Sequence, residues 1–417
     1  MKFLLEGGYP LEGEISVQGS KNSVLPILAA TLLIDGVSVI HNCPLISDVS
    51  AAKSILRDYG CLVKSEKNTV IVDASSLKEG DVTDSLLRQM RSSILFLGPV
   101  LSRLGKARFC FPGGCEIGLR PIDLHLNAIK KLGSKVVEEN GSVICSADKR
   151  MSGEKIHLTF PSVGATESVM LCAVLAKGTT VLSNAAREPE IVDLASFLNK
   201  AGAKIRGAGE STLIIEGVDK LHSVEHTVIS DRIAGATYLF CAVSSGGKIK
   251  VNNLDVSFLQ SVFPLLEECG CTLKYEKNSV FLSAPERINA ASTVRTMPYP
   301  GFPTDLQSPA AAMLSTADGT SVIVENIFEN RFKYIGQLNR MGANIRVEGR
   351  TAIIQGVRRL RSAEVDACDL RGGFALIIAA LNASGITQIN NISHIDRGYE
   401  RAEDVLSSLG AKIKRIT

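Results

Sequence analysis

The stretch LNKAGAKIR, residues 198–206, reads as the last turn of an amphipathic helix, a glycine, and the start of a strand. Glycine suits the middle position because the residue that ends a helix often adopts a left-handed conformation. The pattern occurs five more times, as LRDYGCLVK (56–64), IKKLGSKVV (129–137), LEECGCTLK (266–274), LNRMGANIR (338–346) and LSSLGAKIK (406–414). The glycines are residues 60, 133, 202, 270, 342 and 410, so successive copies are 73, 69, 68, 72 and 68 residues apart. Spacing this regular indicates an internal repeat.

Each repeat has a second common feature upstream of its glycine. A strand-like run ends in a small or polar cluster, and an apolar helical segment follows. The clusters are GSKNS (19–23), MRSS (90–93), PSVGATES (161–168), SDRIAGAT (230–237), FPTDLQS (302–308) and DLRGG (369–373). One repeat therefore reads strand, helix, strand, helix and two strands, a βαβαββ unit. Such mixed units pack helices behind a sheet, which predicts an α/β (α+β) fold class.

The helices that follow the clusters are apolar nearly all round, as in SVLPILAATLL (23–33) and FALIIAAL (374–381). Helices of this kind lie inside a core. We therefore expect two globular domains of three units each, with the first helix of every unit buried. The longest apolar stretches fall well short of the ~18 residues that a membrane span needs, so no membrane association is expected.

The buried helices have an electrostatic consequence. If the three helices of a domain run parallel, their N-termini emerge on one face. Each N-terminus carries about half a positive charge and free N–H groups, which bind phosphate and carboxylate. Lys21, Arg91, Arg232 and Arg371 lie at these helix starts and reinforce the effect. We therefore expect a multiply anionic small-molecule substrate.

Composition excludes several other classes of function. The 417 residues contain 46 Lys and Arg and 43 Asp and Glu, a net charge of +3 without a basic run, so no nucleic acid partner is expected. The 10 cysteines show no C-x-x-C and no zinc spacing, and the N-terminus does not read as a signal peptide. These features predict a cytoplasmic protein with free thiols. The sequence contains no Walker loop, no G-x-G-x-x-G motif and no metal-ligand cluster, so no metal, no redox cofactor and no other cofactor is expected.

One cysteine does not fit a structural role. In FPGGCEIGLRPIDLHL (111–126), Cys115 follows two glycines, and Glu116, Arg120 and Asp123 come within the next eight positions. Structural cysteines usually lie buried among aliphatic residues. A thiol near arginines can ionise or donate a proton. The sequence therefore predicts a functional thiol on an accessible loop.

Seven segments, in order along the chain, resemble the bacterial UDP-N-acetylglucosamine enolpyruvyltransferases. They are GSKNSVLPILAA (19–30), PGGCEIGLRPIDLH (112–125), FPSVGATE (160–167), YPGFPTDLQ (299–307), ENIFENRF (325–332), DLRGGFAL (369–376) and DRGYERAEDVL (396–406). Most are weak singly, but seven in order over six repeats are specific. The resemblance covers essentially the whole chain.

The resemblance implies an enzyme that joins the enolpyruvyl group of phosphoenolpyruvate to the 3-hydroxyl of UDP-N-acetylglucosamine and releases phosphate by addition and elimination. This is the first committed step of peptidoglycan synthesis, and hence of cell-wall biogenesis. Addition needs a proton delivered to the methylene carbon and a proton removed from the hydroxyl, each worth about 100- to 10,000-fold when a positioned group does it. By resemblance, Cys115 is the acid, forms a covalent adduct with phosphoenolpyruvate, and is the target of fosfomycin.

The resemblance also assigns the groups around the reacting atoms. Asp305 matches a carboxylate beside the sugar hydroxyl, as base or orienting group, although its position also fits a helix N-cap. The expected catalytic residues are Cys115, Asp305, Lys21, Arg397 and Asp369. The expected phosphoenolpyruvate-binding residues are Lys21, Asn22, Arg120, Arg371 and Arg397.

The nucleotide sugar has a larger expected set. Ser162, Val163 and Gly164 fit a phosphate contact at a glycine-containing helix start. His125 is expected to pack rather than to catalyse, because no nucleophile is paired with it. The expected UDP-N-acetylglucosamine-binding residues are Asn22, Arg91, Arg120, Pro121, Ile122, Asp123, Leu124, Ser162, Val163, Gly164, Asp305 and Ile327.

The resemblance implies a two-domain, inside-out α/β barrel-like fold. Residues 1–20 plus 230–417 form the expected catalytic domain, which carries Asp305, Asp369, Arg371 and Arg397. Residues 21–229 form the other domain, with the Cys115 loop and the uridine site. Closure of the domains would keep water from a reactive enol ether intermediate. The protein is expected to be a monomer.

Three alternatives remain at this point. The sister family, 5-enolpyruvylshikimate 3-phosphate synthase, shares the fold, the donor and the GSK start, but its acceptor does not require the PGGC loop or RPIDLH. A silent paralogue that senses UDP-sugar should have lost Cys115, Asp305, Lys21 or Arg397, and all four are present. A ligand-free repeat scaffold needs no converging arginines and lysines.

Overall fold

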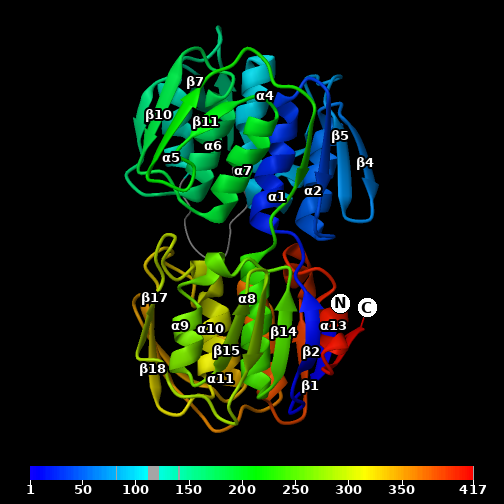
Figure 1. Ribbon diagram of the computed structural model, residues 1–417, viewed down its shortest axis with the longest axis vertical. Coiled ribbons are helices and arrows are strands. Elements are labelled where there is room, and N and C mark those ends of the chain that lie inside the picture. Colours follow the sequence, from blue (N-terminus) through cyan, green and yellow to red (C-terminus); the bar gives the residue numbers. More distant parts are fainter. Residues whose placement is uncertain (81, 111–121, 140, 417) are drawn as a thin grey trace. The chain divides into compact units, whose positions relative to one another are not determined.

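The computed structural model describes residues 1–80, 82–110, 122–139 and 141–416 (Figure 1). The described chain divides into two compact units. Residues 1–18 and the part from Ser230 onward form the C-terminal unit, and the described residues of 19–229 form the N-terminal unit. The backbone therefore leaves the C-terminal unit after Gln18 and re-enters it after Ile229.

The N-terminal unit contains three small sheets. Their strands, in spatial order, are β13 (Val224–Thr227), β3 (Val37–His41), β5 (Thr69–Asp73) and β4 (Leu62–Glu66); β6 (Lys106–Cys110), β8 (Ser142–Ser146) and β7 (Lys135–Glu139); and β11 (Lys204–Arg206), β12 (Thr212–Glu216), β10 (Thr179–Ser183) and β9 (Lys155–His157). The helices are α1 (Lys21–Ala30), η1 (Thr31–Leu33), α2 (Ser47–Asp58), α3 (Asp84–Gln89), η2 (Arg91–Phe96), α4 (Leu97–Leu104), α5 (Asp123–Lys131), α6 (Val163–Ala173) and α7 (Pro189–Lys200).

The C-terminal unit also contains three sheets. Their strands, in spatial order, are β21 (Glu364–Asp366), β22 (Ile386–Asn390), β1 (Lys2–Glu6) and β23 (Lys412–Ile416); β15 (Thr272–Glu276), β16 (Ser279–Ser283), β14 (Lys248–Asn252) and β2 (Glu12–Ser16); and β17 (Thr293–Arg295), β18 (Thr320–Val324), β20 (Thr351–Gln355) and β19 (Asn344–Glu348). The helices are α8 (Arg232–Ser245), η3 (Val256–Leu259), α9 (Phe263–Glu268), η4 (Thr304–Leu306), α10 (Gln307–Leu314), α11 (Ile335–Arg340), α12 (Leu370–Asn382), η5 (Ile392–Arg397) and α13 (Ala402–Ser408).

The repeat glycines adopt the predicted left-handed conformation. Their φ angles are 84° at Gly60, 99° at Gly133, 102° at Gly202, 88° at Gly270, 90° at Gly342 and 96° at Gly410. A side chain at such an angle meets the following carbonyl, so glycine is the residue that lets the helix end and the chain turn into the next strand.

Two strands are exchanged between repeats at the points where the chain changes unit. β2 precedes α1 in sequence but pairs in parallel with β14 of the C-terminal unit. In return, β13 precedes α8 in sequence but pairs in parallel with β3 of the N-terminal unit. The chain therefore adds β2 to a sheet of the C-terminal unit just before it leaves that unit, and adds β13 to a sheet of the N-terminal unit just before it returns.

One repeat departs from the predicted pattern. Where a strand was expected before the MRSS cluster, the structure has helix α3. The Thr83 hydroxyl caps this helix by accepting a hydrogen bond from the Leu86 amide at 3.4 Å. The local cap favours helix over strand here, and the sheet of this repeat has three described strands.

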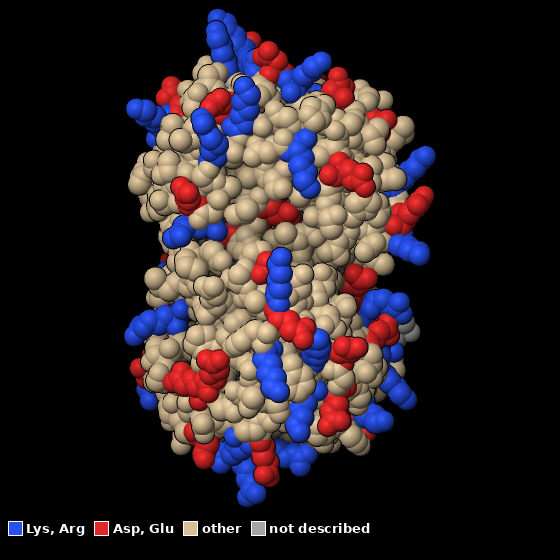
Figure 2. Space-filling model, viewed as in Figure 1, with Lys and Arg blue, Asp and Glu red and all other residues tan. Residues whose placement is uncertain are grey.

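The first helix of each repeat is buried, as predicted. In the C-terminal unit, every residue of α10 and all but one or two of α8 and α12 are buried, and the three helices pack on one another. In the N-terminal unit, α1, α4 and α6 form the corresponding core with strands and outer helices around them. Acidic and basic side chains are interspersed over the face seen in Figure 2. Among the described residues, no helix is long and apolar enough to cross a membrane.

Candidate active site

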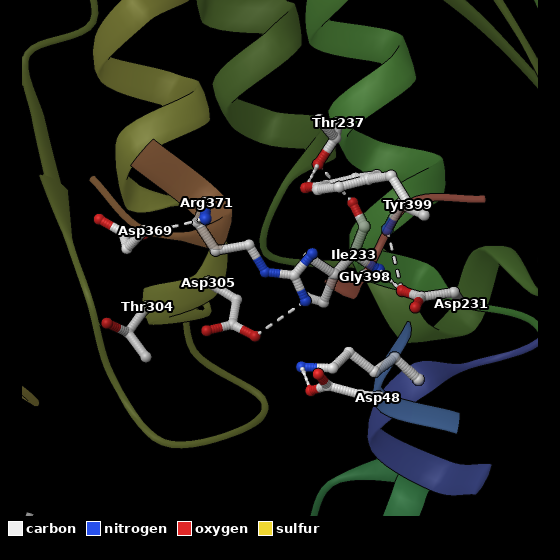
Figure 3. A network of polar contacts seen from close by, with 12 residues as sticks. Asp48, Asp231, Ile233, Thr237, Thr304, Asp305, Asp369, Arg371, Gly398 and Tyr399 are labelled. Carbon is white, nitrogen blue, oxygen red and sulfur yellow. Dashed lines mark hydrogen bonds and ion pairs between the residues drawn. The ribbon is translucent and has the colours of Figure 1, made fainter. Parts of the chain in front are cut away.

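Carboxylates cap two of the three core helices of the C-terminal unit. Asp231 accepts hydrogen bonds from the amides of Ile233 and Ala234 at 2.9 Å each, at the start of α8. Asp369 accepts from the amides of Arg371 and Gly372, also at 2.9 Å each, at the start of α12. Figure 3 shows both caps in one polar network with the Arg371 side chain. The positive ends of these helices therefore lie around Arg371.

Asp305 lies in the short turn η4 that leads into α10. The alternative that it caps a helix is wrong, because Pro303 is the N-cap residue of η4 and Leu306 is that of α10. The Asp305 carboxylate contacts two arginines instead. Its Oδ1 accepts from Arg331 Nη2 at 2.8 Å, and its Oδ2 accepts from Arg371 Nη2 at 3.1 Å. Both arginine side chains are 3% exposed, whereas Asp305 is 26% exposed. A carboxylate held this way presents a fixed direction to a bound hydroxyl.

Arg331 was not among the predicted site residues, although it lies in the quoted ENIFENRF segment. Its Nη1 donates to the Thr304 hydroxyl at 3.1 Å, and Thr304 donates to Glu325 Oε2 at 2.9 Å. Glu325 is fully buried, and its Oε1 accepts from the amide of Ile327 at 2.8 Å. The predicted sugar contact at Ile327 and the Asp305 carboxylate are thus held by one hydrogen-bonded chain.

Arg371 is buried with part of its hydrogen-bonding capacity unused. Among the described residues, its Nε and Nη1 make no hydrogen bond. Its guanidinium stacks over the ring of Tyr399, 5.2 Å from the centroid. Burial acts against its charge, but Tyr399, Asp305 and Asp231 more than compensate and raise its pKa. A buried cation with unmade donors is costly, so this geometry suits an anionic ligand.

Arg397 is the last residue of η5, in the same unit. The residue before it, Asp396, accepts from Arg415 Nη1 at 2.9 Å and Nη2 at 2.7 Å. Two residues after it, Tyr399 shares a hydrogen bond with the Thr237 hydroxyl at 3.1 Å. The backbone around Arg397 is therefore fixed from both sides.

Lys21 begins α1 in the N-terminal unit, and Asn22 follows it. Lys21 Nζ lies 2.9 Å from Asp48 Oδ2, and the two side chains are 12% and 4% exposed. Two residues after Lys21, Ser23 donates to buried Asp193, which also accepts from the Ile229 amide at 3.2 Å. The start of α1 is thus tied to the segment that returns the chain to the C-terminal unit.

The predicted nucleotide residues of the N-terminal unit lie at helix starts. Arg91 begins η2, and Asp123 and Leu124 form the first turn of α5 behind the N-cap residue Ile122. Ser162 caps α6 by accepting from the Ala165 amide at 3.3 Å, so Val163 and Gly164 form its first turn. These positions offer backbone N–H groups of the kind that bind phosphate.

His125 fills the space beside this helix start. A Cβ at Gly164 would lie 2.9 Å from His125 Cε1, so only glycine allows this approach. His125 Nδ1 shares a hydrogen bond with Ser168 Oγ at 2.8 Å. Burial, with a smaller contribution from the charge of Arg91, lowers the pKa of His125 to about 4. The imidazole is therefore neutral and packed.

The lowered pKa of His125 predicts a pH dependence of stability. In the unfolded chain its pKa is near 6.5, so below that pH the unfolded state binds more protons and the folded state is destabilised down to about pH 4. At pH 5 this amounts to about 2 kcal/mol. A His125→Gln variant keeps a hydrogen-bonding side chain but cannot titrate. Between pH 7 and pH 5, denaturant midpoints should fall more for the wild type than for the variant. Parallel curves would contradict the assignment.

Cys115, Arg120 and Pro121 lie outside the described residues, so their roles stay predictions. Of the nine described cysteines, eight are buried and Cys368 is half-buried. Burial raises the pKa of Cys61 and Cys145 to about 11 and that of Cys172 to about 12. Such thiols are poor acids at neutral pH. Among the described residues, no group of three or more metal-ligating side chains occurs.

Comparisons of the sequence and of the fold with known proteins place the chain among the enolpyruvyl transferases. The sequence model of the family EPSP synthase (3-phosphoshikimate 1-carboxyvinyltransferase) matches residues 5–406. UDP-N-acetylglucosamine 1-carboxyvinyltransferase 2 of Caldanaerobacter subterraneus subsp. tengcongensis is 51% identical over 415 residues, which cover 100% of this chain and 99% of the relative. UDP-N-acetylglucosamine 1-carboxyvinyltransferase 1 of Symbiobacterium thermophilum is 50% identical over 420 residues, covering 100% and 95%. The crystal structure of the enolpyruvyl transferase NikO from Streptomyces tendae has a TM-score of 0.89 at 25% identity, covering 99% of this chain and 98% of that one. The predicted fold class is confirmed.

Proposed function

Because the chain belongs to the EPSP synthase family, we propose that it transfers the enolpyruvyl group of phosphoenolpyruvate to the 3-hydroxyl of UDP-N-acetylglucosamine and releases phosphate. Two relatives that are about half identical over the full length carry that acceptor in their names. The reaction is the first committed step of peptidoglycan synthesis. The predicted family resemblance is confirmed by these relatives.

The observation that carries the proposal is the pairing of Asp305 with Arg371. A carboxylate able to orient or deprotonate a hydroxyl lies 3.1 Å from a buried guanidinium that retains unused donors. Addition to phosphoenolpyruvate needs both groups, because the hydroxyl must lose its proton while the carboxylate and phosphate of the donor are held. Arg331 and Arg371 hold the two oxygens of the Asp305 carboxylate at 2.8 and 3.1 Å, which fixes the direction in which this carboxylate meets a bound hydroxyl.

The remaining site residues are assigned to the two substrates. Lys21, Asn22 and Arg397, with Arg371 and Arg120, would bind phosphoenolpyruvate and stabilise the charge of the tetrahedral intermediate. Cys115 would deliver a proton to the methylene carbon, and Asp369 would lie near the reacting groups. The helix starts at Arg91, Asp123 and Ser162 would bind the nucleotide.

The competing acceptor is shikimate 3-phosphate, which the family name of the matching sequence model includes. Full-length identity of 50% and 51% to relatives named for the nucleotide sugar favours UDP-N-acetylglucosamine. In the silent-paralogue alternative, the protein would bind UDP-N-acetylglucosamine but would not transfer the enolpyruvyl group to it.

Phosphate release from phosphoenolpyruvate tests the proposal directly. The purified protein is assayed with UDP-N-acetylglucosamine and, in parallel, with shikimate 3-phosphate. We expect release only with the nucleotide sugar. Release only with shikimate 3-phosphate would assign the other acceptor. Folded protein that binds UDP-N-acetylglucosamine but releases no phosphate would be a silent paralogue.

A further inference from the structure

Gln18 is the last residue of the C-terminal unit before the chain first leaves it. Its backbone carbonyl accepts from the amide of Asp231, just after the chain returns, at 2.9 Å. Its side chain reaches the segment that follows Arg397. Nε2 donates to the carbonyl of Gly398 at 3.0 Å, and Oε1 accepts from the amide of Glu400 at 2.7 Å. A single half-buried carboxamide therefore uses both of its polar ends on one short loop.

The loop that Gln18 contacts lies against the start of α12. Gly398 and Tyr399 are buried. A Cβ at Gly398 would lie 2.8 Å from Leu370 Cδ2, at the start of α12. On the other side of Arg397, Asp396 makes its paired hydrogen bonds with Arg415. The loop is thus held before Arg397 through Asp396, and after it through the Tyr399 side chain, which hydrogen-bonds Thr237, and through the backbone of Gly398 and Glu400, which hydrogen-bonds Gln18.

We propose that Gln18 is a positioning residue for Arg397, and through it for the anionic donor substrate. The inference rests on the proposed function, in which Arg397 binds phosphoenolpyruvate. Gln18 lies 379 residues from Arg397 in sequence, and its carboxamide hydrogen-bonds the backbone of this loop at 3.0 and 2.7 Å. Its loss would let the loop move and would weaken binding of the donor without touching the acceptor site.

The test is a Gln18→Leu variant, which keeps the side-chain size and removes both hydrogen bonds. Each such bond contributes a few-fold in an equilibrium, so KM for phosphoenolpyruvate should rise about tenfold, while KM for UDP-N-acetylglucosamine should stay within about twofold. Gln18→Glu keeps the acceptor for the Glu400 amide but sets an oxygen against the Gly398 carbonyl in place of the N–H donor, so KM for phosphoenolpyruvate should rise in this variant too, again without a change in KM for UDP-N-acetylglucosamine. If the Gln18→Leu variant does not fold, the KM values of Gln18→Glu still test whether Gln18 positions Arg397.

Asn339→Leu is the matched control. The Asn339 carboxamide also holds the backbone of one short segment, since Nδ2 donates to the Ile345 carbonyl at 2.9 Å and Oδ1 accepts from the Ile345 amide at 3.1 Å. These bonds join α11 to β19 in the same unit. We expect both KM values of this variant to match the wild type.

Amide hydrogen exchange provides a readout that does not depend on turnover. The Glu400 amide loses its acceptor in Gln18→Leu, so exchange over 398–400 should become faster, while the Asn339→Leu variant should leave it unchanged. Unchanged exchange in Gln18→Leu, or equal rises in both KM values, would overturn the inference. Wild-type protein that releases no phosphate would overturn the proposed function and the link from Arg397 to phosphoenolpyruvate, while exchange would still decide whether Gln18 holds the loop.

Discussion

Replacement of Asp305 by asparagine is expected to lower kcat about a thousandfold, the middle to upper range for loss of a positioned acid–base group. Asparagine has nearly the same shape, but it cannot accept the hydroxyl proton, and it loses the charge that Arg331 and Arg371 now neutralise at 2.8 and 3.1 Å. KM for UDP-N-acetylglucosamine should change only a few-fold, since the loss falls on the transition state. Steady-state kinetics of phosphate release measures both.

The control for Asp305 is Asp318→Asn. Asp318 also pairs with an arginine in the same unit, Arg287, at 3.2 Å, but it is 69% exposed. An exposed pair of this kind contributes little, so kcat should not change. An Asp305→Asn enzyme with kcat within about threefold of the wild type would remove Asp305 from the list of catalytic groups.

The fold was predictable where its signal is local. A glycine that ends a helix is recognisable within nine residues, and six copies of it defined the repeat. The exchange of β2 and β13 was not predictable in this way, because strand pairing depends on partners more than 180 residues away, such as Val224 with Ser38. Helix α3 was not predicted in its repeat, because the Thr83 cap outweighs a weak strand pattern.

The site was predictable in residue identity but not in pairing. Asp305 was singled out, yet the two arginines that hold it come from 26 and 66 residues further along the chain. Arg331 lies in the ENIFENRF segment, but it was therefore not predicted as a site residue. Gln18 gave no signal at all, because its partners are 380 and 382 residues away. Side-chain partners of this kind are set by the packed fold rather than by spacing.

Arg371→Met is expected to lower kcat/KM for phosphoenolpyruvate at least about a thousandfold, because it removes both the charge and the unused donors assigned to the donor substrate. Stability should hold or rise. A buried cation is costly unless fully paired, and methionine fills a similar volume without that cost. Asp305 keeps Arg331 at 2.8 Å, so no carboxylate is left without a partner. Thermal unfolding tests the predicted stability of this variant, and steady-state kinetics on the same preparation tests the predicted loss of kcat/KM.

Arg331→Met separates substrate binding from support of Asp305. Both arginine side chains are 3% exposed and both bind the same carboxylate, but Arg331 also donates to Thr304 and so belongs to the chain that holds Ile327. Its loss should lower kcat while leaving KM for phosphoenolpyruvate within a few-fold. If Arg331→Met and Arg371→Met instead lose kcat equally and have the same KM for phosphoenolpyruvate, Arg371 acts only through Asp305. Other groups must then bind the anionic donor substrate. A selective rise in KM for phosphoenolpyruvate in Arg371→Met would place the substrate anion on the guanidinium, where the fold has gathered the N-termini of its buried helices.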